Sequence, residues 1–337
     1  MKTRELKAMV LAVLAAFFYA LSTPVSKIIL EHVGPTMTAS MLYLGAGIGI
    51  GILFLFNGRK EPRSDRLARS DLPYVIGMIL LDISAPILLM NGISRTTAAN
   101  ASLLNNFEIA ATSILAFIIF KEKISKRMCV ALLLVIFSSL ILSFEGGSSL
   151  SFFTGSLLVL GAATCWGLEN NCTRMIASKS TYEIVIIKGF FSGIGALIVA
   201  LILGEKLPDI KYMLLIFLVG FVSYGMSIFV YIRAQSVLGA AKTSSFYALA
   251  PFIGAFISFL ILGEKPDGRY IVALVVMIFG TLFAVVDTLK YSHSHIHSHT
   301  IHHLRNGKME TEIITHEHSH SHMGPGLAHH HTHKEER

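Results

Sequence analysis

Charged residues are scarce in this sequence of 337 residues: Asp, Glu, Lys and Arg make up only 15% of it, whereas 53% is hydrophobic. A soluble protein of this length needs more charge to cover its surface, so this composition and a mean hydropathy of +0.64 indicate an integral membrane protein. Cysteine is also rare. The three cysteines lie within apolar runs and form no Cys-x-x-Cys pair, so the sequence offers no disulfide framework.

The sequence lacks the usual marks of an enzyme and of a nucleic-acid-binding protein. It contains neither a phosphate-binding loop nor a nucleophile–base–acid set, so we expect no catalytic activity and no required cofactor. The formal net charge is +7. Most of the basic residues lie in short loops between apolar runs, where they set membrane orientation and do not indicate nucleic acid as a partner.

Ten apolar runs are long enough to cross a lipid bilayer as helices, since about 20 residues at 1.5 Å rise span a core of roughly 30 Å. None of them alternates polar and apolar residues as a membrane-spanning strand does. Loop Lys and Arg number sixteen on the N-terminal side and five on the other, which predicts a multi-pass protein of the cytoplasmic (inner) membrane with both termini in the cytoplasm. The expected spans are 8–30, 36–56, 72–91, 97–120, 127–143, 155–177, 182–203, 210–232, 240–262 and 268–289.

One stretch of the chain occurs twice. Residues 98–123 read AANASLLNNFEIAATSILAFIIFKEK, and residues 240–265, 142 positions later, read AAKTSSFYALAPFIGAFISFLILGEK. A second match joins AAFFYALSTPVSK in the first span to AATCWGLENNCTR in the sixth. An odd number of spans in each repeat inverts the second repeat relative to the first, which is a recurring architecture of secondary transporters. The sequence therefore predicts an all-α fold with two inverted five-helix units, 1–145 and 150–289, and a separate segment, 290–337.

These repeated stretches resemble the EamA-type permeases of the drug/metabolite transporter superfamily, which have ten helices in two repeats. The resemblance is carried by LLNNFEIAATSILAFIIFKEK, FYALAPFIGAFISFLILGEK and AATCWGL, and covers about 8–289. Family members usually have Glu-Pro before an apolar helix that ends in Gly-Glu. Here Ile109 stands where Pro is usual and Lys121 replaces the Gly, while the second copy has Ala250 in place of Glu. The resemblance implies a transporter of small metabolites without identifying the substrate.

Two carboxylates are the sharpest functional candidates. A charge at the centre of a membrane helix costs about 2.5–3.5 kcal/mol, so it normally faces a polar space or a partner. Asp82 lies near the middle of the third span and Glu108 near the middle of the fourth. The short turn between these spans predicts that they are antiparallel neighbours, so that both carboxylates share one cavity and take part in proton coupling. The alternative is that each only hydrogen-bonds within the bundle.

Further polar and aromatic side chains are expected to shape the same substrate site. Each of them has a packing role as its alternative. Lys188 and Arg174 could pair with an acid of the sixth span, but we expect both to be basic groups at helix ends that reach toward the membrane surface. The further substrate-site candidates are Asn105, Asn106, Tyr224, Tyr247, Glu169 and Trp166.

Prolines and glycines within the spans suggest where helices bend or touch. Pro24, Pro86 and Pro251 each remove a backbone hydrogen bond and are candidate hinges. GxxxG spacing begins at Gly47 in the second span and at Gly189 in the seventh. Such spacing lets helices approach closely, either at a crossing inside the protein, which we favour, or in a homodimer.

The segment after Ser292 is rich in histidine and holds fourteen of the fifteen histidines. Its composition cannot build a core, so we expect it to be disordered without metal. Alternating His-x-His favours Zn or Ni, which would make the tail a metal buffer or sensor and allows a divalent-metal permease as the alternative function. A pH sensor and a solvated tail without a transport role are the other interpretations. The candidate metal ligands are His293, His295, His297, His299, His316, His318, His320 and His322.

Overall fold

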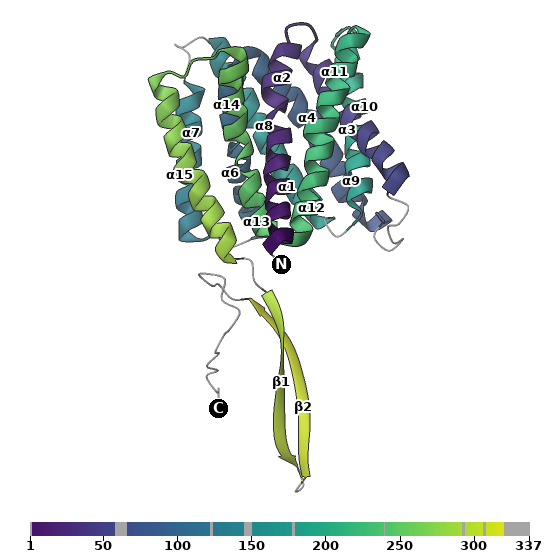
Figure 1. Ribbon diagram of the computed structural model, residues 1–337, viewed down its shortest axis with the longest axis vertical. Coiled ribbons are helices and arrows are strands. Elements are labelled where there is room, and N and C mark those ends of the chain that lie inside the picture. Colours follow the sequence, from purple (N-terminus) through teal and green to yellow (C-terminus); the bar gives the residue numbers. More distant parts are fainter. Residues whose placement is uncertain are drawn as a thin grey trace. The chain divides into compact units, whose positions relative to one another are not determined.

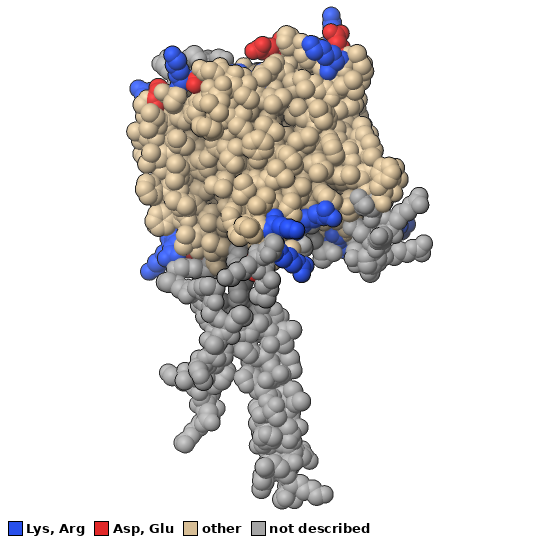
Figure 2. Space-filling view, viewed as in Figure 1, with Lys and Arg blue, Asp and Glu red and all other residues tan. Residues whose placement is uncertain are grey.

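The computed structural model describes residues 2–57, 66–121, 124–144, 150–176, 179–238, 240–291, 294–305 and 308–319. Within these ranges ten helical segments are long and apolar enough to cross a membrane, which confirms the expected number. The expected bounds agree with the observed ones to within a few residues at most ends. In Figure 1 these segments form a bundle, and the space-filling view shows charge gathered at its two ends with an uncharged belt between them (Figure 2).

Several spans are built from more than one helix. In chain order the elements are α1 (Lys2–Ala20), α2 (Ser22–Ile29), α3 (Pro35–Asn57), η3 (Arg69–Asp71), α4 (Leu72–Arg95), α5 (Ala98–Leu104), α6 (Phe107–Phe120), α7 (Lys126–Ser143), α8 (Leu150–Met175), α9 (Thr181–Ile187), η4 (Lys188–Ser192), α10 (Gly193–Ile202), α11 (Ile210–Gly220), η5 (Phe221–Met226), α12 (Ser227–Leu238), α13 (Ala240–Tyr247), α14 (Ala250–Leu262) and α15 (Gly268–Tyr291). The segments η4 and η5 are π-helical turns in the seventh and eighth spans. Such turns interrupt a helix locally and occur often at functional sites.

Three helices organise the packing of the bundle. Helix α8 packs against α4 and α6, and α1 packs against α12 and α14. The third packing centre is α3, which contacts α10, α11 and η5. Large apolar side chains such as Leu133, Leu218 and Leu260 point outward and are 58–68% exposed, as expected for a surface that faces lipid.

Helix α3 crosses η4 of the seventh span where glycine leaves no side chain. A Cβ atom on Gly189 would lie 2.5 Å from the Gly47 Cα, and one on Gly47 would lie 2.9 Å from the Phe190 nitrogen. Only glycine fits such a contact between two backbones. The GxxxG spacing therefore serves an internal crossing, as we favoured from the sequence.

Two glutamates just after the ends of α10 and α14 join these ends to the starts of other helices. The Glu205 carboxylate accepts hydrogen bonds from the Thr36 and Met37 nitrogens at 3.1 and 2.7 Å, at the start of α3. The Glu264 carboxylate accepts two bonds of 2.8 Å from the first amides of α5, those of Ala98 and Ala99. We call these two contacts the clasps. Each joins the end of one span to the start of another and satisfies amides that a helix start leaves unpaired.

Both clasp glutamates belong to a copy of the same hexapeptide, LILGEK, at 201–206 and 260–265. Its glycines adopt a left-handed conformation, with φ of 76° at Gly204 and 64° at Gly263, which ends the helix and directs the following glutamate toward its partner. At the corresponding end of α6, Lys121 takes the same conformation with φ of 55°. The departure from glycine at Lys121 therefore keeps the turn at a cost of roughly 1 kcal/mol.

The histidine-rich segment differs from our expectation. Disorder is not confirmed for residues 294–305 and 308–319, where β1 (Ser294–Arg305) and β2 (Lys308–Ser319) pair antiparallel as a hairpin. The reason is visible in the sequence: β-branched residues, which favour strands, recur in both segments. Residues 320–337 lie outside the described part of the chain.

Candidate functional site

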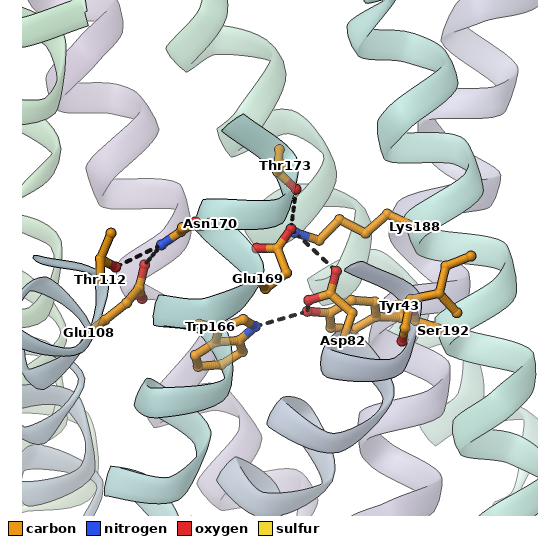
Figure 3. A network of polar contacts seen from close by, with 11 residues as sticks. Tyr43, Asp82, Glu108, Thr112, Trp166, Glu169, Asn170, Thr173, Lys188 and Ser192 are labelled. Carbon is orange, nitrogen blue, oxygen red and sulfur yellow. Dashed lines mark hydrogen bonds and ion pairs between the residues drawn. The ribbon is translucent and has the colours of Figure 1, made fainter. Parts of the chain in front are cut away.

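A lysine binds two carboxylates in the interior of the bundle (Figure 3). The Lys188 Nζ lies 3.1 Å from Asp82 Oδ2 and 3.0 Å from Glu169 Oε1. Both carboxylates are almost fully buried, with 0% and 2% exposure. The three side chains come from η4, α4 and α8, so this triad joins three spans. Because ionised groups in a bilayer require partners, the triad can persist only as a unit.

Hydrogen bonds hold the triad in place. The Tyr43 hydroxyl donates to Asp82 Oδ1 at 2.9 Å and accepts from the Trp166 Nε1 at 3.2 Å. The Thr173 hydroxyl donates to the Glu169 carboxylate. Trp166 therefore links α8 to α3 next to Asp82 (Figure 3).

Glu108 lies on the other side of α8 from Asp82 (Figure 3). Its carboxylate accepts a hydrogen bond of 2.6 Å from the Asn170 Nδ2. The expectation that Asp82 and Glu108 belong to neighbouring spans does not describe this arrangement, since α4 and α6 each pack against α8. The sequence argument assumed that consecutive spans touch, but here the sixth span is inserted between them. The two acids are linked instead through Glu169 and Asn170, which follow one another on α8.

Tyrosine rings extend the site toward α1 and α13. Tyr224 lies in η5, with its ring 5.6 Å from that of Tyr43 and 5.9 Å from that of Tyr19. Tyr247 lies at the end of α13, 5.6 Å from Tyr19 between ring centroids, and shares a hydrogen bond of 3.2 Å with the Ser227 hydroxyl. The structure thus brings both predicted tyrosines into one aromatic chain that begins at the triad.

The remaining candidates lie at or near breaks in the helices. Asn105 and Asn106 form the break between α5 and α6, one turn before the Glu108 side chain. Pro251 follows the break between α13 and α14, and Pro24 lies just after the break between α1 and α2. Pro86, by contrast, is inside the continuous helix α4. Three breaks inside membrane-spanning segments thus lie at or beside candidate residues, and broken helices are a recurring feature of transporter binding sites.

The main residue that the sequence argument misjudged is Lys188. It was expected to reach toward the membrane surface, but its ion pairs with Asp82 and Glu169 are inside the bundle. The available signal was its position seven residues after Thr181, where the span begins, which is too deep for a helix-end group. Of the eight candidate metal ligands, His293, His320 and His322 lie outside the described residues, and the other five belong to β1 and β2.

A buried, charged centre within a bundle that has ten membrane-spanning segments in its described residues defines a multi-pass membrane protein. The sequence model of the EamA-like transporter family matches residues 6–144 and 153–286. The chain therefore belongs to the EamA-like transporter family, which is not a class of enzymes.

Similar proteins agree with this assignment. An uncharacterized transporter of Methanothermobacter thermautotrophicus is 28% identical over 302 residues, covering 82% of this chain and 85% of its own. The uncharacterized transporter YyaM of Bacillus subtilis is 23% identical, with 79% and 90% covered. One solved crystal structure has the same fold, with a TM-score of 0.60 at 15% identity over 84% of this chain and 97% of the other.

Proposed function

We propose that this protein is a secondary transporter that moves a small organic metabolite, such as an amino acid or a related solute, across the cytoplasmic membrane by alternating access coupled to protons. The observation that carries the proposal is a group of three carboxylates inside the bundle: Asp82 and Glu169 are paired with the single Lys188, and Glu108 is bonded to Asn170, the neighbour of Glu169. Helix packing alone does not call for this arrangement, because apolar contacts would hold helices together at lower cost. A path for polar solutes does call for it.

The packing of the bundle supports the inverted repeat that alternating access requires. Helix α4 packs against α8, and its equivalent in the second unit, α12, packs against α1, the equivalent of α8. The contact of α6 with α8 has a counterpart in that of α14 with α1. The two segments matched by the family, 6–144 and 153–286, also agree with units 1–145 and 150–289. We assign the N-terminal end of the bundle to the cytoplasm from its excess of Lys and Arg.

We expect Asp82→Asn to slow transport at least tenfold. The neutral amide of asparagine carries no charge to form an ion pair with Lys188 when the binding partners of this lysine change during transport. Everted vesicles containing wild type or variant are loaded with a pH-sensitive dye and tested with a panel of amino acids, nucleosides and amines. Glu31→Gln, a change at an exposed acid outside the network, is the control and should behave as wild type. Equal rates for Asp82→Asn and wild type would remove Asp82 from the mechanism.

The alternative function, a divalent-metal permease with a metal-binding tail, is favoured by one observation. In the register of the hairpin, His295 is opposite His318 and His297 is opposite His316. Residues two apart share a face of a strand, so this register puts the four histidines at adjacent positions on one face of the hairpin. Zn²⁺ takes four ligands in a tetrahedron and accepts imidazole nitrogen.

We expect substitution of these four histidines by alanine in the full-length protein to remove about one tightly bound Zn²⁺ per chain. Equilibrium dialysis followed by metal analysis measures it. The matched control replaces four other tail histidines by alanine and should retain the ion; they are His329, His330, His331 and His333. Equal losses in both variants would mean that composition, and not strand register, binds the metal. If a chain ending at Lys290 lost Zn²⁺ or Ni²⁺ flux in vesicles, the metal permease would replace the first proposal.

A further inference from the structure

The central network has more negative than positive charge. Asp82 and Glu169 share the single Lys188, while the contact given for the Glu108 carboxylate is the neutral Asn170 amide. With all three acids ionised, three negative charges face one positive charge, and two remain uncompensated among these four side chains. A positive charge brought by a ligand would lower the electrostatic energy of this site, whereas an anion would raise it.

A group of aromatic rings shares the polar interior with the carboxylate that has no ion pair. The charge of Glu108 acts on the Tyr19 and Tyr247 hydroxyls. These two rings are tilted by 37° with centroids 5.6 Å apart, and Tyr231 meets Tyr247 edge-on at 5.1 Å. The faces of tyrosine rings attract organic cations within about 6 Å. A carboxylate and a group of such rings in one interior are suited to an ammonium group that carries apolar substituents.

The same side chains have surface left for a ligand to cover. Glu108, Tyr19 and Tyr247 are partly exposed although all three lie within membrane-spanning segments, Glu108 and Tyr19 in the middle third of theirs. In the adjoining break between α5 and α6, the Oδ1 atoms of Asn105 and Asn106 are buried, with side chains 7% and 2% exposed, and have no hydrogen-bond partner within the described chain. Unpaired buried acceptors are costly, and N–H donors of a ligand would satisfy them.

We propose that the transported solute is an organic ammonium ion, bound with its charge on Glu108 and its apolar part against Tyr19 and Tyr247. This rests on the proposed transport function and names its substrate class. A bare metal ion fits less well at this site, since no group of three or more His, Cys, Asp and Glu side chains in the described part of the helical bundle could hold one. A neutral sugar would not compensate the excess negative charge, and a simple carboxylate would increase it.

The single tryptophan of the chain, Trp166, lies inside the network and reports on binding by its fluorescence. The full-length protein in nanodiscs is titrated with three ligands of matched shape: phenethylammonium, the neutral 2-phenylethanol and the anionic phenylacetate. Methylammonium and tetraethylammonium extend the cationic series. We expect saturable binding of at least one cation and of neither uncharged nor anionic analogue. No saturable binding of any cation up to about 10 mM, or tighter binding of phenylacetate or 2-phenylethanol, overturns the proposal.

Variants test the named residues. Glu108→Gln should weaken binding of the cation about 10- to 100-fold, as expected for losing a charged acceptor. Tyr247→Leu should weaken it about three- to tenfold, whereas Tyr247→Phe, which keeps the ring face, should restore most of it. Glu31→Gln should have no effect. Unchanged affinity in Glu108→Gln contradicts the assignment even if the cation binds.

Flux separates the two proposals. If vesicles transport neutral or anionic members of the series but not the cations, the protein is a transporter and the inferred substrate class is wrong. If the cations bind as described but none of the tested solutes crosses the membrane, the cation site stands and the proposed transport function fails.

Discussion

Lys188→Met is expected to abolish transport and to lower the free energy of unfolding by about 3–5 kcal/mol. The change leaves Asp82 and Glu169, both buried, without the cation that they share, and an unpaired buried charge costs about this much. Denaturant unfolding of the purified protein in detergent and the vesicle assay measure the two effects.

A triple variant separates stability from function. Adding Asp82→Asn and Glu169→Gln to Lys188→Met removes all three charges and should recover most of the lost stability, because a neutral cluster carries no unpaired charge. Transport should stay absent, since no titratable group then remains in the triad. If the triple variant regained transport, the triad would be structural. If Lys188→Met alone were as stable as wild type, the ion pairs would not have the weight given to them here.

Removal of both clasps should shift the protein toward a state open at their end of the bundle. Each clasp consists of two hydrogen bonds from helix-start amides to a carboxylate, and the loss of such a cap costs about 1–2 kcal/mol. For Glu205→Ala with Glu264→Ala we expect about 3 kcal/mol, or roughly a 100-fold change in the population ratio. Hydrogen exchange at the amides of Thr36, Met37, Ala98 and Ala99 should accelerate accordingly.

Two comparisons make this test specific. Asp209→Asn changes an exposed acid in the same loop as Glu205, whose side chain caps no amide, and should leave exchange unchanged. Gly34→Ala should act like Glu205→Ala, because a Cβ on Gly34 would lie 2.2 Å from Glu205 Oε2 and displace the carboxylate. Slow exchange in the doubly substituted protein would mean that other contacts keep this end closed.

The sequence was sufficient for the spans. Hydropathy and length identified the ten segments that the structure has as helices, because the bilayer imposes both. The cost of charge at mid-membrane also pointed correctly to Asp82, Glu108 and Glu169 as residues with polar partners. These inferences depend on local composition, which a single chain displays directly.

What the sequence did not reveal was which spans meet. Lys188 finds its partners on α4 and α8, which precede it in the sequence by 106 and 19 residues at Asp82 and Glu169. The order of the spans in the sequence was a poor guide to their contacts, since α8 lies between Asp82 and Glu108, which we expected to share one cavity. The clasps were missed for the same reason, although the duplicated LILGEK was a signal. Identical termini of two helices indicate equivalent tasks at two places.

The close crossing of α3 and η4 at Gly47 and Gly189 has a mechanical consequence. Neither residue has a side chain, so the two backbones touch and keep the second and seventh spans together at this point. We expect a change in the angle between these spans to pivot about the contact, so that they separate on one side of the membrane and approach on the other. Under the proposed alternating access, two residues without side chains would then supply the pivot.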